Sequence, residues 1–220
     1  MRSVIALQCC CADGREAASL TTYSLARQEE RERRQLDLRQ PHVASLTEFV
    51  LSLRAQYGLS SEIPFFDPLD GGVNAKVLFL LEAPGGKAVA SGFISRDNPD
   101  PTARNVSLIS EEAGLSRKLT IAWNIVPWYV GSGTRIRAVN QTDITSAMQA
   151  LRELRPLLPD IKVVLLVGSK AQKAKEVVDN LFDVPILGCP HPSQRVFNVW
   201  PDKRNVVKEI FAEAARLAAG

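Results

Sequence analysis

The fold of this chain is decided by residues 76–86, whose sequence is KVLFLLEAPGG. Residues 76–81 form a short, almost continuously apolar run, which is typical of a strand buried on both faces of a parallel sheet. The run stops at a Pro/Gly-rich segment that begins with Glu82, so the predicted strand ends in a tight polar loop. Open α/β sheets bind ligands at the carboxyl ends of their strands, which makes this loop the first candidate for a binding site.

Three more segments have the character of strands: residues 120–123, 162–167 and 184–187. Apolar residues at helical spacing between and around these segments predict helices over residues 43–53, 102–114 and 143–157. Two further helices are predicted, one after Ser169 as its N-cap and one after Asp202. Strands that alternate with helices indicate an α/β protein. We expect a three-layer α/β/α sandwich with a central four-stranded parallel sheet.

The chain has 220 residues, which is enough for one compact α/β domain and an extension. Residues 27–34 mix both signs of charge and lack a wide apolar face. We therefore expect residues 1–40 to form an N-terminal extension, either an exposed helix or a disordered arm, and residues 41–220 to form the domain.

Composition excludes several classes of protein. The net charge of +3 is too small to demonstrate a nucleic-acid partner, although a local basic groove is compatible with it. Three of the four cysteines are adjacent, Cys9, Cys10 and Cys11, and no CxxC spacing occurs, so neither a disulfide framework nor a zinc site is indicated. A reducing, cytoplasmic location is the expectation. Residues 4–7 are too short for a secretory signal, and no stretch approaches the ~18 apolar residues of a membrane span.

The loop after the first strand fails the common phosphate-binding patterns. A Walker A loop needs glycine where Leu81 stands and serine or threonine where Ala88 stands, and the chain contains no GxGxxG. What remains is a turn whose exposed backbone N–H groups could bind a carbonyl oxygen or an anion. The alternative is a plain strand-to-loop turn with an exposed Glu82.

A second segment, CPHPSQR at residues 189–195, follows the fourth predicted strand. Its histidine, His191, stands between two prolines that restrict the backbone. A rigid imidazole is well suited to donate a hydrogen bond to a developing oxyanion. The alternative is a histidine that only packs or caps a turn.

Asn124 comes where the second predicted strand should end, at the same edge as both loops. Its amide offers one donor and one acceptor, which match O4 and N3–H of uracil, whereas cytosine presents the reverse pattern. The alternative is a buried asparagine that satisfies backbone groups at the end of the strand.

These segments, taken in order, resemble the signature motifs of the uracil-DNA glycosylase superfamily over roughly residues 75–200. The first motif is most similar to the E-A-P-G core of the iron–sulfur-containing family 4 enzymes. The resemblance implies a monomeric, monofunctional glycosylase that removes uracil from DNA and so starts base excision repair. It also implies a uracil-binding set comprising Ala83, Pro84, Gly85, Phe93 and Asn124. Phe93 would stack on the base, and a neutral His191 would donate to O2. The implied DNA-binding set, in the place of the minor-groove wedge, is Pro192, Ser193, Gln194 and Arg195.

The departures from the family pattern also carry expectations. The cysteines do not reproduce the spacing of the family 4 cluster, so we expect neither a metal nor a cofactor. Ala83 stands where the best-known family has the aspartate that positions water. Glu82, a backbone carbonyl or Asp97, in that order, would have to replace it. Two alternatives stay open: a non-catalytic binder of uracil-containing or abasic DNA, and an α/β enzyme acting on a free nucleoside or small metabolite.

Overall fold

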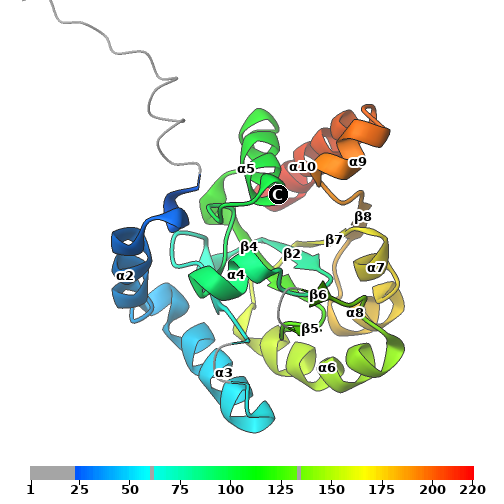
Figure 1. Ribbon diagram of the computed structural model, residues 1–220. Helices are drawn as coiled ribbons and strands as arrows, with labels where there is room; N and C mark the ends of the chain where they lie inside the picture. Colours follow the sequence, from blue (N-terminus) through cyan, green and yellow to red (C-terminus); the bar gives the residue numbers. More distant parts are fainter. Residues whose placement is uncertain (1–22, 60–61, 133–134) are drawn as a thin grey trace, which may run out of the picture.

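The computed structural model describes residues 23–59, 62–132 and 135–220. Its centre is a four-stranded sheet in which every neighbouring pair is parallel, with strand order β4-β2-β7-β8 (Figure 1). The strands are β4 (Thr120–Asn124), β2 (Val77–Leu81), β7 (Val163–Val167) and β8 (Ile186–Cys189). The predicted parallel sheet is therefore confirmed. Its two inner strands, β2 and β7, are the two with nearly unbroken apolar sequences, because both of their faces are covered.

Alternate residues of the strands face two separate apolar layers. Leu78 and Leu80 belong to the layer that is packed with α3 (Pro41–Tyr57) and α6 (Gln141–Leu154). Val77 and Phe79 belong to the opposite layer, with α5 (Pro101–Glu112) and α10 (Lys203–Ala219). There the ring of Phe79 meets Phe211 edge-on, with 5.1 Å between centroids. Figure 1 shows α5 and α10 on one side of the sheet and α3 and α6 on the other, as the α/β/α prediction requires.

Shorter elements complete the fold. The helices are α2 (Gln28–Asp37), α4 (Gly86–Ser91), α7 (Ser169–Gln172), α8 (Lys175–Leu181) and α9 (Gln194–Val199), with single 3-10 turns η1 (Ser24–Ala26), η2 (Gly72–Asn74), η3 (Arg117–Leu119) and η4 (Arg155–Leu157). Two small sheets pair β1 (Phe65–Phe66) with β3 (Phe93–Ile94) and β5 (Gly131–Ser132) with β6 (Arg135–Ile136).

The helix expected after Ser169 differs from the prediction in two ways. It is divided into α7 and α8, and its N-cap is Gly168, while Ser169 is the first helical residue. In the part of the chain that the structure describes, no helix has both the length and the apolar character needed to cross a bilayer.

Helix α2 lies within the stretch expected to be an extension. Most of its residues are exposed, but Arg34 is only 1% exposed and bonds to Asp67, Asp97 and Ser24. The mixed-sign sequence did not indicate this buried arginine, because these three partners come from outside the helix, in addition to Glu30 within it. Residues 1–22, including the three adjacent cysteines, lie outside the described part, and the boundary near residue 41 stays a prediction.

Candidate functional site

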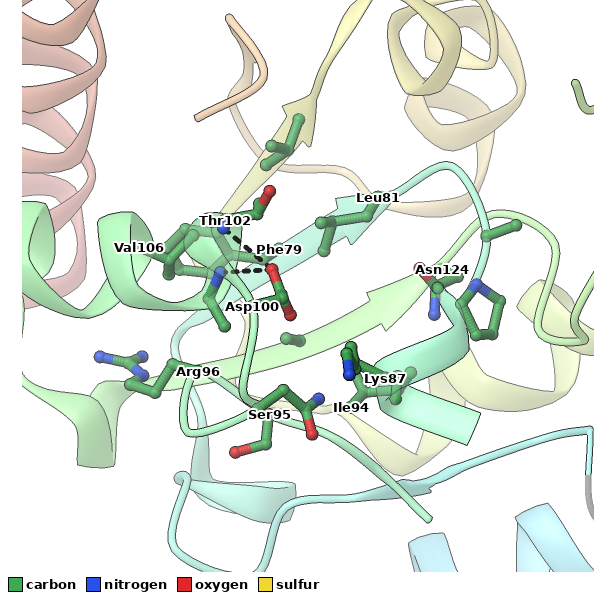
Figure 2. A pocket seen from close by; sticks show the side chains of 18 of the residues that line it. Phe79, Leu81, Lys87, Ile94, Ser95, Arg96, Asp100, Thr102, Val106 and Asn124 are labelled. Atoms are coloured by element: carbon green, nitrogen blue, oxygen red, sulfur yellow. Dashed lines mark hydrogen bonds between the residues drawn. The ribbon is translucent and has the colours of Figure 1, made fainter. Parts of the chain in front are cut away.

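A pocket of about 370 Å³ opens at the carboxyl edge of β2 and β4 (Figure 2). Its lining includes five residues that the sequence singled out: Ala83, Pro84 and Gly85 after β2, Asn124 at the end of β4, and His191 after β8. The two Pro-containing loops, more than a hundred residues apart in the chain, therefore meet at one edge of the sheet. The volume is in the range of small-molecule sites in proteins.

The register of the sheet brings these groups to one level. Leu81 and Asn124 are the last paired residues of β2 and β4. The next residues continue the pairing, since Ile125 N–H donates to the Leu81 carbonyl at 2.8 Å and Val126 N–H donates to the Glu82 carbonyl at 3.0 Å. The loop that begins at Glu82 is thus fixed beside the Asn124 side chain.

Asn124 is only 3% exposed, yet its Nδ2 has no hydrogen-bond partner among the described residues. An unpaired buried donor of this kind costs roughly 1–3 kcal/mol. Because Asn124 lines the pocket, a carbonyl oxygen of a bound ligand would satisfy this donor. In Figure 2 its amide points into the hollow from the end of β4.

His191 is held close to the turn that follows β7. Gly168 adopts a φ of +90°, and a Cβ there would lie 3.2 Å from His191 Cδ2, so glycine is needed both for the backbone and for the space. Burial lowers the pKa of His191, and the charges of Glu82 and Asp100 offset this only in part. The imidazole is therefore neutral near pH 7, with one ring N–H to donate.

Residues 68–215 match the family model described as the uracil DNA glycosylase superfamily. This chain belongs to the uracil DNA glycosylase superfamily. Among solved structures, it is similar to the solution NMR structure of a candidate uracil DNA glycosylase from Methanosarcina acetivorans, with 14% identity and a TM-score of 0.48. The match covers 66% of this chain and 93% of that one. No curated protein matches the sequence.

Membership of the uracil DNA glycosylase superfamily suggests an enzyme that hydrolyses N-glycosidic bonds, with DNA as its substrate. The pocket, rather than the fold, has to identify the base on which such an enzyme acts.

The structure does not bring Phe93 into the pocket, in disagreement with the stacking role expected from the resemblance. Its ring is 0% exposed and packs against Phe65, with 6.5 Å between centroids. Successive residues of a strand point to opposite faces, and in β3 it is Ile94 that lines the pocket. The apolar side chain offered to a ligand at this position is therefore that of Ile94.

Two carboxylates expected to position water also lie elsewhere. Asp97 Oδ2 accepts hydrogen bonds from Arg34 and Arg117, and Asp97 is not a lining residue. Its surroundings are a buried network of charged groups instead of a cavity. Glu82 also lies outside the lining, and its Oε1 accepts from Val139 N–H at 3.1 Å.

The loop expected to contact DNA leads from His191 into α9. The Pro192 carbonyl accepts from Asn105 Nδ2 at 2.8 Å, which ties the loop to α5. Ser193 is the N-cap of α9, accepting from Val196 N–H at 3.3 Å. Gln194 and Arg195 are exposed in the first turn of that helix. This leaves the Arg195 guanidinium at the surface beside the pocket loop.

One side of the pocket is supported by a buried charged cluster, which comprises Arg34, Asp67, Asp70, Arg96, Asp97 and Arg117. Of these, Asp70 and Arg96 line the pocket. Burial raises the pKa of Asp70 to about 6, Arg117 counteracts the shift, and the Asp67 charge adds to it. The cluster is a set of mutually compensated charges instead of a free acid or base.

The described part of the chain contains no group of three or more histidine, cysteine or acidic side chains arranged to hold a metal ion. Cys189 is buried, which raises the pKa of its thiol to about 12 and keeps it protonated at neutral pH. A thiol in this state is a poor metal ligand.

Some lining residues were missed from the sequence. They include Lys87 in the first turn of α4, Asn98, whose Oδ1 is buried with no partner among the described residues, and Asp100 and Thr102 at the start of α5. The pair Asp100-Pro101 is a typical N-cap followed by proline at the first helical position, so the sequence could have predicted that a helix begins there. It could not have predicted that this helix begins at the pocket.

Proposed function

We propose that this chain is a monofunctional glycosylase that hydrolyses the N-glycosidic bond of deoxyuridine in DNA. The observation that carries the proposal is the buried amide donor of Asn124, unpaired among the described residues, in the same pocket as a neutral His191. A pocket with these groups suits a small planar ligand that has carbonyl oxygens on two edges, as uracil has.

In the proposed complex the deoxyuridine is flipped out of the duplex, at a cost of a few kcal/mol. Asn124 Nδ2 donates to O4, and the amide oxygen accepts from N3–H. Cytosine, with an amino group at C4 and an unprotonated N3, would place donor against donor. Selectivity of this kind costs the wrong base ~1–3 kcal/mol.

His191 acts on the leaving group. As the bond between C1′ and N1 breaks, negative charge moves onto uracil, and the neutral imidazole donates its N–H to O2. A single preorganised donor of this type is worth roughly 10²–10³ in rate. Burial supports the role, because desolvation keeps His191 neutral and strengthens the hydrogen bond.

Further parts of the proposal rest on the sequence. The turn Glu82-Ala83-Pro84-Gly85 indicates kinship with family 4, without its cluster. Gln194 and Arg195, exposed beside the loop, would fill the gap left by the flipped base and contact phosphate. We take residues 41–220 as the glycosylase domain of a monomer.

The test is a single-turnover assay on an oligonucleotide with one deoxyuridine, in buffer with a chelator, followed by alkaline cleavage of abasic sites. Deoxycytidine and thymidine substrates serve as matched controls. We expect strand cleavage for the deoxyuridine substrate and none for the deoxycytidine substrate. Tight binding of uracil-containing or abasic duplex without any base release would instead identify a non-catalytic binder. Release of base from free nucleosides alone would identify a nucleoside enzyme.

A further inference from the structure

The pocket contains a carboxylate that neither the sequence motifs nor the family match assigns. Asp100 lines it together with His191 and Asn124. The other acidic lining residue, Asp70, is bound by Arg117 with 2.8 Å between Oδ1 and Nε. Within the described ranges, Asp100 forms no ion pair, so its charge is available to the pocket.

Asp100 is held rigidly by the start of α5. Its Oδ1 accepts both N-capping bonds, from Thr102 N–H at 2.9 Å and from Ala103 N–H at 3.0 Å. No donor in the described part of the chain binds its Oδ2. Figure 2 shows the two bonds as dashed lines to one oxygen, with the other oxygen turned toward the hollow across from Asn124. One oxygen therefore anchors the carboxylate and the other can accept a hydrogen bond from within the pocket.

Asp100 is also electrostatically coupled to the candidate oxyanion donor. Its negative charge raises the pKa of His191 against the larger, opposite effect of burial. The two side chains line the same pocket. A carboxylate in that pocket would stabilise positive charge at C1′ as well as bind water.

We propose that Asp100 is the catalytic carboxylate that binds the attacking water and removes its proton. The inference rests on the proposed function and takes the place of Glu82 and Asp97 as candidates for this role. Asp100 Oδ2 accepts a hydrogen bond from water, and the water oxygen forms the new bond to C1′. The bond between C1′ and N1 breaks, and its electron pair leaves with uracil, which His191 stabilises. The water proton passes to Asp100 and then, directly or through solvent, to the uracil anion, which leaves an abasic site and neutral uracil.

The experiment uses Asp100→Asn and Asp100→Ser in the full chain. Both side chains can cap α5 through oxygen, so the helix start is retained while the carboxylate is lost. We expect the single-turnover rate of uracil release to fall by about 10²–10⁴, the range for a positioned general base. Duplex binding and the thermal midpoint should change little. Glu111→Gln, on an exposed position of the same helix, is the matched control and should behave as wild type.

Each outcome is decisive. An active wild type with Asp100 variants within a few-fold of it would overturn the inference and leave the proposed function intact. A wild type that releases no base from any DNA substrate would overturn the proposed function and the inference with it. A large loss of rate in both variants, with binding preserved, supports both.

Discussion

At the scale of single residues, the site depends on polar atoms that the fold leaves without partners. Asn124 Nδ2 and Asn98 Oδ1 are both buried and line the pocket, and neither has a hydrogen-bond partner in the part of the chain that the structure describes. Asn98 Nδ2 is bound to the Phe93 carbonyl at 2.9 Å, and a carbonyl can only accept, so the amide nitrogen must face Phe93 and the oxygen must face elsewhere. Such groups destabilise the empty protein and are compensated when a ligand binds.

This situation predicts the behaviour of Asn124→Ala. Because Nδ2 bonds to nothing in the described structure and its burial is unfavourable, its removal should not lower the thermal midpoint. Uracil excision should fall by about 10–100-fold, the value of one good base-edge contact. Asn180→Ala, an exposed asparagine on α8, is the control for the substitution itself. Excision within a few-fold of wild type would mean that Asn124 only supports the end of β4.

At the scale of elements, the loop between β8 and α9 is attached at three points. Gly168, after β7, donates its N–H to the Cys189 carbonyl at 2.8 Å and leaves room for the His191 ring. Asn105 of α5 holds the Pro192 carbonyl, and Ser193 caps α9. His191 consequently faces the pocket while Arg195, four residues further on, is exposed.

We therefore expect the two ends of this loop to have separable functions. His191→Ala should reduce the single-turnover rate by roughly 10²–10³ with little loss of duplex binding. Arg195→Ala should weaken duplex binding and its salt dependence, with a smaller effect on single-stranded substrate, since no stacked gap needs to be filled there. Rates and dissociation constants on both substrates measure the difference. If both variants lose rate and binding to the same extent, the loop acts as one structural unit.

At the scale of the whole molecule, the charged cluster connects segments that are distant in the chain. Arg34 of α2 pairs with Asp67 and Asp97, and Arg117 of η3 pairs with both of these and with Asp70. The cluster thereby joins α2 to the segment behind the pocket. Removing one member of a buried network leaves another charge uncompensated, which typically costs ~3–5 kcal/mol.

Asp70 makes this cluster sensitive to pH. Its pKa is raised from 3.8 to about 6, mainly by burial. Between these values the unfolded chain has already lost the proton that the folded protein keeps. The contribution of protonated Asp70 to the stability of the folded protein is thus complete below pH 3.8 and is lost as pH rises through about 6. Urea unfolding of wild type and Asp70→Asn between pH 4 and pH 7 measures it. As pH rises from 4 to 7, the unfolding free energy of wild type should fall relative to that of Asp70→Asn by up to about 3 kcal/mol. A difference between the two proteins that stays constant with pH would show that Asp70 does not titrate in this range.

The sequence by itself determined the sheet and the edge at which the pocket lies. An unbroken apolar run such as residues 163–167 is typical of a strand covered on both faces, and a parallel topology brings the carboxyl ends of such strands together. Pro/Gly-rich loops at those ends predicted where Ala83, Asn124 and His191 would meet, and all three line the pocket. These conclusions depend on local patterns, which one sequence contains in full.

The tertiary structure alone decided which side chains enter the pocket. Phe93 and Ile94 differ by one position in a two-residue strand, and only the pairing of β3 with β1 shows which of them turns inward. From the sequence alone, Asp97 and Asp100 are equally good candidates for the carboxylate that binds water. Arg34, 63 residues away from Asp97 in the chain, withdraws that carboxylate into the charged cluster, while the N-terminus of α5 holds Asp100 at the cavity. The physical reason is that a buried charged side chain is stable only beside groups that compensate its charge. Those groups come from distant segments of the chain that only folding brings together.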